Sequence, residues 1–102
     1  MAVEIKWTLH ALHDIESIAE FIAQDSEHFA AIQIDKFFIR SQILERFSFA
    51  GRVVPELGDE HIRELIEGNY RIIYRVVSKN RVDILTIHQS YQLLSSNPLF
   101  KK

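Results

Sequence analysis

The sequence predicts an α+β fold with the element order β-αα-βββ, in which a helical hairpin packs on one face of a small, mainly antiparallel sheet. Three observations lead to this prediction. Apolar residues recur every three or four positions in the first half and every two in the second, and a loop with two glycines and a proline separates the halves. Two amphipathic helices covering one face of a sheet bury the apolar sides of both layers.

The first half begins with a short strand, residues 3–7 (VEIKW), followed by two helices. Thr8 is the expected N-cap of the first helix and Ser26 that of the second, which is expected to run to about Phe47. Because only the four residues DSEH interrupt the pattern, the helices are expected to be antiparallel neighbours. Three aromatic residues of the second helix are assigned to the core: Phe37, Phe38 and Phe47.

The second half is expected to hold a loop and three strands. Gly51 is expected to end the second helix, and the loop continues to residue 60. The strands are predicted at 61–66, 70–77 and 82–88, with the turn EGN between the first two. Residues 89–102 are expected to form a short helix or a loose tail, and 1–102 a single domain.

Composition excludes several classes of protein. The chain has 102 residues and no cysteine, so disulfides, thiol chemistry and cysteine metal sites are ruled out. No signal peptide and no apolar run long enough for a bilayer are recognised, which favours a cytoplasmic protein without membrane contact. Residues 1–50 hold four basic and eight acidic side chains, a balance of −4, and residues 51–102 hold eight and six, a balance of +2. If a polyanion is bound, the second half is therefore the expected face.

Arginines on the predicted strands are the first candidates for a binding surface. Arg71 and Arg75 alternate with Tyr70 and Tyr74, which are assigned to core packing on the opposite side of the strand. The alternative for Arg71 is an ion pair with a neighbouring carboxylate such as Glu64. The candidate partner-binding residues are Arg52, Arg63, Arg71 and Arg75.

These elements and several short motifs resemble the RelE/ParE family of toxins from bacterial toxin–antitoxin modules. The resemblance covers nearly the whole chain: Trp7 closing the first strand, the helical hairpin, GRVVPEL at 51–57, IREL at 62–65, NYRIIYRV at 69–76 and ILTIH at 84–88. It implies an antitoxin partner, and one of two activities. RelE-like members cleave mRNA in the ribosomal A site, whereas ParE-like members inhibit DNA gyrase.

A ribonuclease needs a group that takes the proton of the 2′-hydroxyl and a cation for the transition state. The resemblance implies Arg71, His88 and Tyr91 for these roles, with Glu56 or Glu64 beside them. The match is incomplete, because RelE-like ribonucleases place lysines where this chain has Ile62 and Glu64. A second subgroup of the ribonucleases uses a histidine and a tyrosine near this end together with a glutamate. The histidine and tyrosine of that subgroup are adjacent, whereas His88 and Tyr91 are three apart.

The ParE-like reading is therefore favoured: a toxin that inhibits DNA gyrase through protein–protein contacts, arrests growth and stabilises plasmids. Arg63 stands where ParE-like sequences also show an arginine. The protein would form a hetero-oligomer with its cognate antitoxin and would be no enzyme. The alternatives are a RelE-like ribosome-dependent mRNA endonuclease, which would be an enzyme, and a non-toxic interaction module of the same fold. No cofactor and no metal are expected.

Overall fold

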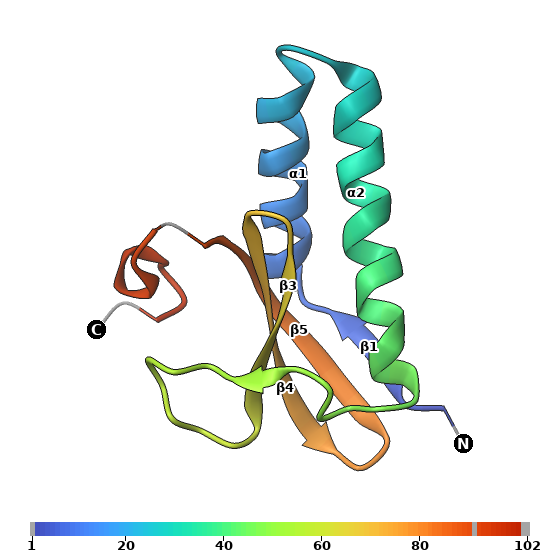
Figure 1. The fold of residues 1–102 in the computed structure, drawn as a ribbon, viewed down its shortest axis with the longest axis vertical. Coiled ribbons are helices and arrows are strands. Elements are labelled where there is room, and N and C mark those ends of the chain that lie inside the picture. The colour runs from blue at the N-terminus through green and yellow to red at the C-terminus, as the bar shows by residue number, and fades with distance from the viewer. Residues whose placement is uncertain (1, 91, 101–102) are drawn as a thin grey trace.

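The computed structural model describes residues 2–90 and 92–100, and within them five strands form one sheet in the order β1-β5-β4-β3-β2 (Figure 1). The first strand pairs with β5 in parallel and the remaining pairs are antiparallel, which confirms the predicted α+β class. The strands in chain order are β1 (Glu4–Trp7), β2 (Arg52–Val53), β3 (Ile62–Glu67), β4 (Tyr70–Ser78) and β5 (Arg81–Gln89).

The helical hairpin consists of α1 (Leu9–Ala23) and α2 (Glu27–Ser41). The Thr8 hydroxyl accepts a hydrogen bond from the Ala11 amide (3.2 Å), and the Ser26 hydroxyl accepts one from the Phe29 amide (3.1 Å), so both predicted caps are confirmed. The prediction that α2 reaches Phe47 was wrong, because the helix tightens into the 3₁₀ turn η1 (Gln42–Glu45) after Ser41. Within the described part of the chain, no helix is long and apolar enough to cross a membrane.

The main core lies between the hairpin and the sheet. Phe37 is fully buried and packs edge-on against Tyr70, with ring centroids 5.2 Å apart. Tyr74 is also fully buried, so the assignment of this side of β4 to core packing is confirmed. Phe38 and Phe47 are exposed, at 37% and 63%, and the expectation that they belong to the core was wrong. Phe38 lies on the rim against Trp7, and Phe47 lies beyond the end of η1.

The edge strand β2 was missed within the segment taken for a loop. Arg52 and Val53 pair with Glu64 and Arg63 of β3. Gly51 makes this close approach possible, since a Cβ at this position would lie 2.4 Å from the carbonyl oxygen of Glu64. Gly51 therefore allows the backbone before β2 to approach the backbone of β3 closely, and it does not end the second helix.

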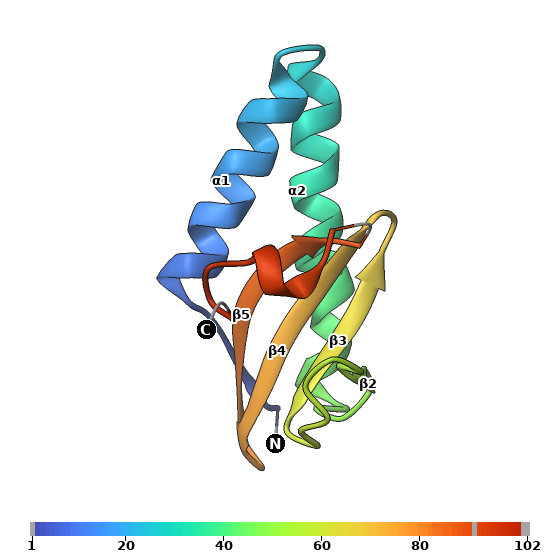
Figure 2. The ribbon, with the colours of Figure 1, turned by 90° about the vertical axis from the view of Figure 1, so that its left-hand side faces the viewer.

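The face of the sheet opposite the helices is partly covered by the C-terminal tail. Figure 2 shows the tail in front of β4 and β5, with α2 behind the sheet. The tail contains one 3₁₀ turn, η2 (Leu94–Ser96), and Leu94 is buried in a second apolar cluster. The buried strand-side members of this cluster are Val54, Ile62 and Ile73. Of the two predicted outcomes for the tail, the described residues therefore form a short helical turn that packs on the sheet.

Candidate functional site: the arginine cluster and its surroundings

Two arginines and two glutamates form an ion-pair network on the tail-side face, called here the arginine cluster: Arg52, Glu56, Glu64 and Arg71. Arg71 Nε donates to Glu64 Oε1 (2.5 Å), and its two terminal nitrogens donate to the carboxylate of Glu56 (2.7 and 2.8 Å). Arg52 Nε donates to the other oxygen of Glu64 (2.5 Å). The pairing register explains the cluster, because Arg52 lies opposite Glu64, and Glu64 and Arg71 point to the same face.

Burial divides the cluster into a fixed part and an accessible part. The side chains of Glu64 and Arg71 are 0% and 8% exposed, whereas that of Glu56 is 43% exposed. The hydrogen bonds from Arg71 lower the pKa of Glu56 to about 2, and the hydrogen bonds to Glu56 and Glu64 raise the pKa of Arg71. Two formal positive and two formal negative charges thus offset one another, and Glu56 is the exposed side chain in front of the Arg71 guanidinium.

Arg63 points to the other side of β3 from the arginine cluster, so the sheet does not gather the candidate arginines on one face. Its Nε donates to the carbonyl of Glu60 (2.9 Å) and its NH1 to the carbonyl of Gly51 (3.0 Å). The guanidinium carbon lies 4.9 Å from the centre of the Phe49 ring, a cation–π contact. Arg63 therefore braces the segment that leads into β2.

Arg75 is exposed, and none of the described residues makes a hydrogen bond or an ion pair with its side chain. It lies two positions after Ile73 on the tail-side face of β4, opposite Ile62 of β3. Arg75 borders a hollow of about 470 Å³ whose other lining residues are Leu57, Asp59, Ile62, Leu85, Leu99 and Phe100. An unpaired cation beside an apolar hollow can bind an anionic group whose apolar part fills the hollow.

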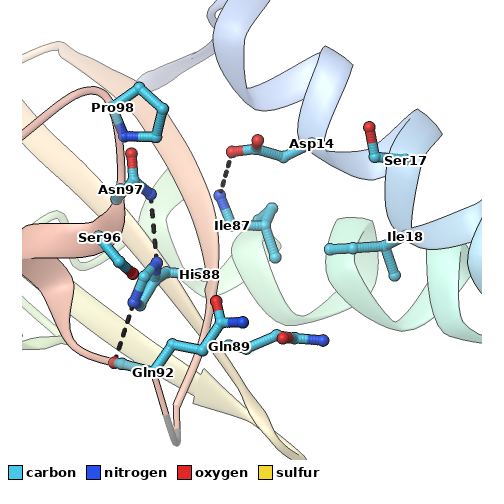
Figure 3. Close-up of a pocket in the computed structure, with 10 residues that line it drawn as sticks. All are labelled: Asp14, Ser17, Ile18, Ile87, His88, Gln89, Gln92, Ser96, Asn97 and Pro98. Atoms are coloured by element: carbon cyan, nitrogen blue, oxygen red, sulfur yellow. Dashed lines mark hydrogen bonds between the residues drawn. The ribbon is translucent and has the colours of Figure 1, made fainter.

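His88 is buried at the end of β5, and both of its ring nitrogens are used (Figure 3). Nε2 lies 3.1 Å from the carbonyl oxygen of Gln92, and Nδ1 lies 3.2 Å from the amide nitrogen of Asn97. A carbonyl can only accept, so Nε2 carries the proton and Nδ1 accepts from Asn97. The sheet places His88 directly opposite Arg71 in the register. Tyr91, the third residue implied for a ribonuclease, lies outside the described residues.

The sequence analysis missed the polar residues around His88. A cavity of about 230 Å³ lies between α1, the end of β5 and the tail, and Asp14, His88 and Asn97 are among its lining residues (Figure 3). Asp14 accepts hydrogen bonds from the hydroxyl of Thr86 and from the amide of Ile87. Thr86 among the apolar residues of the stretch ILTI at 84–87 was the available signal. In the described residues, no group of three or more His, Asp or Glu side chains is placed to hold a metal ion.

Two helices packed on a five-stranded, mostly antiparallel sheet match the fold of ParE and RelE toxin structures. A comparison with protein families identifies residues 5–93 as a ParE toxin of the type II toxin–antitoxin system parDE. The chain therefore belongs to the ParE toxin family, and it is the toxin component of a type II toxin–antitoxin system. No match was found among curated proteins.

Solved structures of two toxin–antitoxin systems share this fold. A chain of the chromosomal ParDE system of Pseudomonas aeruginosa superposes with a TM-score of 0.70 at 20% identity, over 86% of this chain and 96% of that one. A chain of the RelBE2 toxin–antitoxin complex of Mycobacterium tuberculosis superposes with a TM-score of 0.58 at 17% identity, over 87% and 99%. At such identities these likenesses show the fold alone.

Proposed function

We propose that this toxin acts by binding DNA gyrase and inhibiting it, without catalysis of its own. The observation that carries the proposal is that Arg71 and His88 are both engaged internally. The charge of Arg71 is opposed by two carboxylates, and both nitrogens of His88 have partners within the chain. Cleavage of RNA would need a free base and an unopposed cation at the same point.

Arg75 is the proposed centre of the docking surface, because it is exposed and unpaired within the described residues beside an apolar hollow. Arg52, which is 63% exposed, extends positive charge along the same face. Arg71 can take part if an acidic side chain of the partner replaces Glu56, the exposed carboxylate in front of it. Arg63 points to the other side of β3, so any contact that it makes with a partner would lie apart from this surface. Acidic groups of gyrase are the complementary chemistry.

The cognate antitoxin is proposed to neutralise the toxin in a hetero-oligomer by covering this surface. Inhibition of gyrase in the cytoplasm would then arrest growth whenever the antitoxin is lost. Such an arrest is the property by which a toxin–antitoxin module carried on a plasmid stabilises that plasmid.

The test is a pair of assays on the purified protein: supercoiling by DNA gyrase, and cleavage of mRNA on translating ribosomes. Inhibition of supercoiling without cleavage is expected. Arg75→Ala should raise the concentration needed for inhibition about tenfold. Arg46→Ala is the matched control, because Arg46 is also exposed but borders a different hollow, beside Phe47 and Phe49. Equal losses in both variants would contradict docking through Arg75.

One observation favours a RelE-like ribonuclease as the second candidate. Arg71 and His88 are cross-strand neighbours on β4 and β5, so a partner that displaces Glu56 and the tail would leave a cation and an imidazole side by side. In that case ribosome-dependent cleavage would be measured, and both Arg71→Ala and His88→Ala would abolish it. Absence of both activities would instead support a non-toxic interaction module.

A further inference from the structure

A chain of hydrogen bonds runs from α1 through β5 to the C-terminal tail. The hydroxyl of Thr86 donates to the carboxylate of Asp14, and its oxygen accepts from the amide of Asn97 (3.0 Å). The second hydrogen of that amide points to His88 Nδ1 (3.2 Å), and His88 Nε2 donates to the carbonyl of Gln92 (3.1 Å). Thr86, His88 and Asn97 are all buried, and the two bonds that Asn97 donates, to Thr86 and to His88, lie within the buried part of the chain.

The direction of every bond in this chain is fixed. Asp14 can only accept while it is ionised, so the single proton of the Thr86 hydroxyl is committed to it, and Thr86 must accept from Asn97. The Asn97 amide cannot turn over, because its oxygen accepts from the backbone amide of Leu99 (2.9 Å). If the amide were turned over, the NH₂ group of Asn97 would face the N–H of Leu99, which is also a donor. The Asn97 oxygen would then face the Thr86 oxygen, which is also an acceptor. Asn97 therefore presents a donor to His88, and His88 must present a bare Nδ1.

From this geometry we propose that neutral His88 latches the C-terminal tail onto the sheet, and that protonation of His88 releases the tail. A proton on Nδ1 would place an N–H against the N–H of Asn97 within a buried site. Two donors that face each other without an acceptor are unfavourable, and displacement of Asn97 together with the tail would relieve this clash. The inference concerns the tail and does not depend on gyrase being the target.

Release of the tail would change the surface next to the proposed docking residue. Leu94 buries the apolar cluster of Val54, Ile62 and Ile73, and this cluster would lose its cover. Leu99 and Phe100 form one wall of the hollow that Arg75 borders. The protonation state of His88 would thus determine whether the apolar surface beside Arg75 is covered by the tail or exposed to a partner.

Charged groups near His88 come from several elements. From α1, the carboxylate of Asp14 lies beyond Thr86, with His10 3.5 Å from it. From β4, Arg71 lies opposite His88, and the carboxylates of Glu56 and Glu64 pair with Arg71. The described residues of the tail, 92–100, contribute no titratable side chain.

The absence of cysteine allows a clean test with a single spin label. Ser95→Cys places a nitroxide on η2, where Ser95 is exposed, and its mobility is recorded from about pH 8 to about pH 5. The label should be immobile at the higher pH. The ratio of mobile to immobile label should rise as the pH falls, by up to about tenfold per pH unit, the limit for one proton. Trp7 fluorescence and circular dichroism verify that the fold persists.

The pH response of the spin label is compared between the parent and two histidine variants. His88→Gln keeps a donor and an acceptor but no titration, so the label should stay immobile at both ends of the range. His61→Gln removes an exposed histidine and should behave like the parent. In parallel, ¹⁵N NMR of the His88 ring should show the Nε2–H form at high pH and its protonation over the same interval as the release.

A label that stays immobile while NMR reports protonated His88 would overturn the proposal. A His88 that binds no proton before the whole protein unfolds would overturn it as well. If His88→Gln is mobile at every pH, because glutamine fails to reproduce the geometry, the parallel NMR and spin-label titrations of the parent decide the matter.

Discussion

The two faces of the sheet are held by different interactions. The face under the helices packs a continuous apolar cluster that includes Phe37, Leu65, Ile72 and Tyr74. The opposite face combines a small apolar cluster under the tail with the arginine cluster and the chain of hydrogen bonds at His88. Apolar packing does not depend on protonation, whereas ion pairs and directional hydrogen bonds depend on protonation and on each partner being present.

This difference separates the face that supplies stability from the face that can respond to a partner. On the helix side, loss of one large side chain leaves a cavity, and the resulting loss of stability does not depend on protonation. On the tail side, the cost of losing a group depends on what charge or donor it leaves unpaired. Each prediction below tests one side of the comparison.

The largest effect is expected on the helix side. Phe37→Ala should lower the free energy of unfolding by about 3–5 kcal/mol, because Phe37 is fully buried between α2 and the sheet. Urea denaturation followed by circular dichroism measures it. The matched control is Phe47→Ala, at an exposed position, which should change stability by no more than about 0.5 kcal/mol. Similar losses in both variants would contradict the core described here.

On the tail side, Glu64→Gln should cost about 3 kcal/mol, because it removes the buried carboxylate that Arg52 and Arg71 share. Replacing Glu64 by Gln and Arg71 by Met together should cost less than the sum of the single changes. A double-mutant cycle in urea measures this coupling. Additive losses would mean that the ion pair between Arg71 and Glu64 contributes little to the free energy of unfolding.

Sequence reasoning reached the helix side, because hydrophobic periodicity reports burial directly. The hairpin and its caps at Thr8 and Ser26 follow from spacing, whereas the register stayed open and the ion pair of Arg71 with Glu64 was one of two alternatives. Phe38 and Phe47 were misplaced because a phenylalanine near a helix end can lie on the rim as easily as in the core.

The tail side was harder to predict, because its contacts join residues far apart in the chain. The clamp of Glu56 on Arg71 requires the β2–β3 segment to fold back over β4. The contact of Asn97 with His88 requires the tail to cross the sheet. The periodicity of the sequence predicts neither of these two contacts, because both depend on how distant segments pack in three dimensions.

A smaller effect is the dependence of stability on pH that Glu56 gives to the tail-side face. The pKa of Glu56 is lowered from 4.5 to about 2 by the hydrogen bonds from Arg71. The native state therefore favours the ionised form, and this stabilisation is present above about pH 4.5 and is lost as the pH falls toward about 2. Since the Glu56 side chain is 43% exposed, solvent screens the pair, and its contribution should be about 1 kcal/mol or less.

Urea denaturation of the parent and of Glu56→Gln at several pH values measures this contribution. The two stabilities should differ near neutral pH and converge in acid. Glu60→Gln, at an exposed position in the same loop, should show no such convergence. A difference between the parent and Glu56→Gln that stays constant down to about pH 3 would rule out the clamp as its source.

The smallest effect is expected at Arg75, which lies on the same side of β4 as Arg71. Arg75→Ala should change the free energy of unfolding by no more than about 0.5 kcal/mol, because its side chain is exposed and unpaired within the described residues. Arg71→Ala should cost more than about 2 kcal/mol, since it leaves the buried Glu64 with Arg52 alone. Urea denaturation of both variants measures the contrast. A destabilised Arg75→Ala would make Arg75 structural and remove it from the docking surface, whereas a stable variant that no longer inhibits gyrase would assign it to binding.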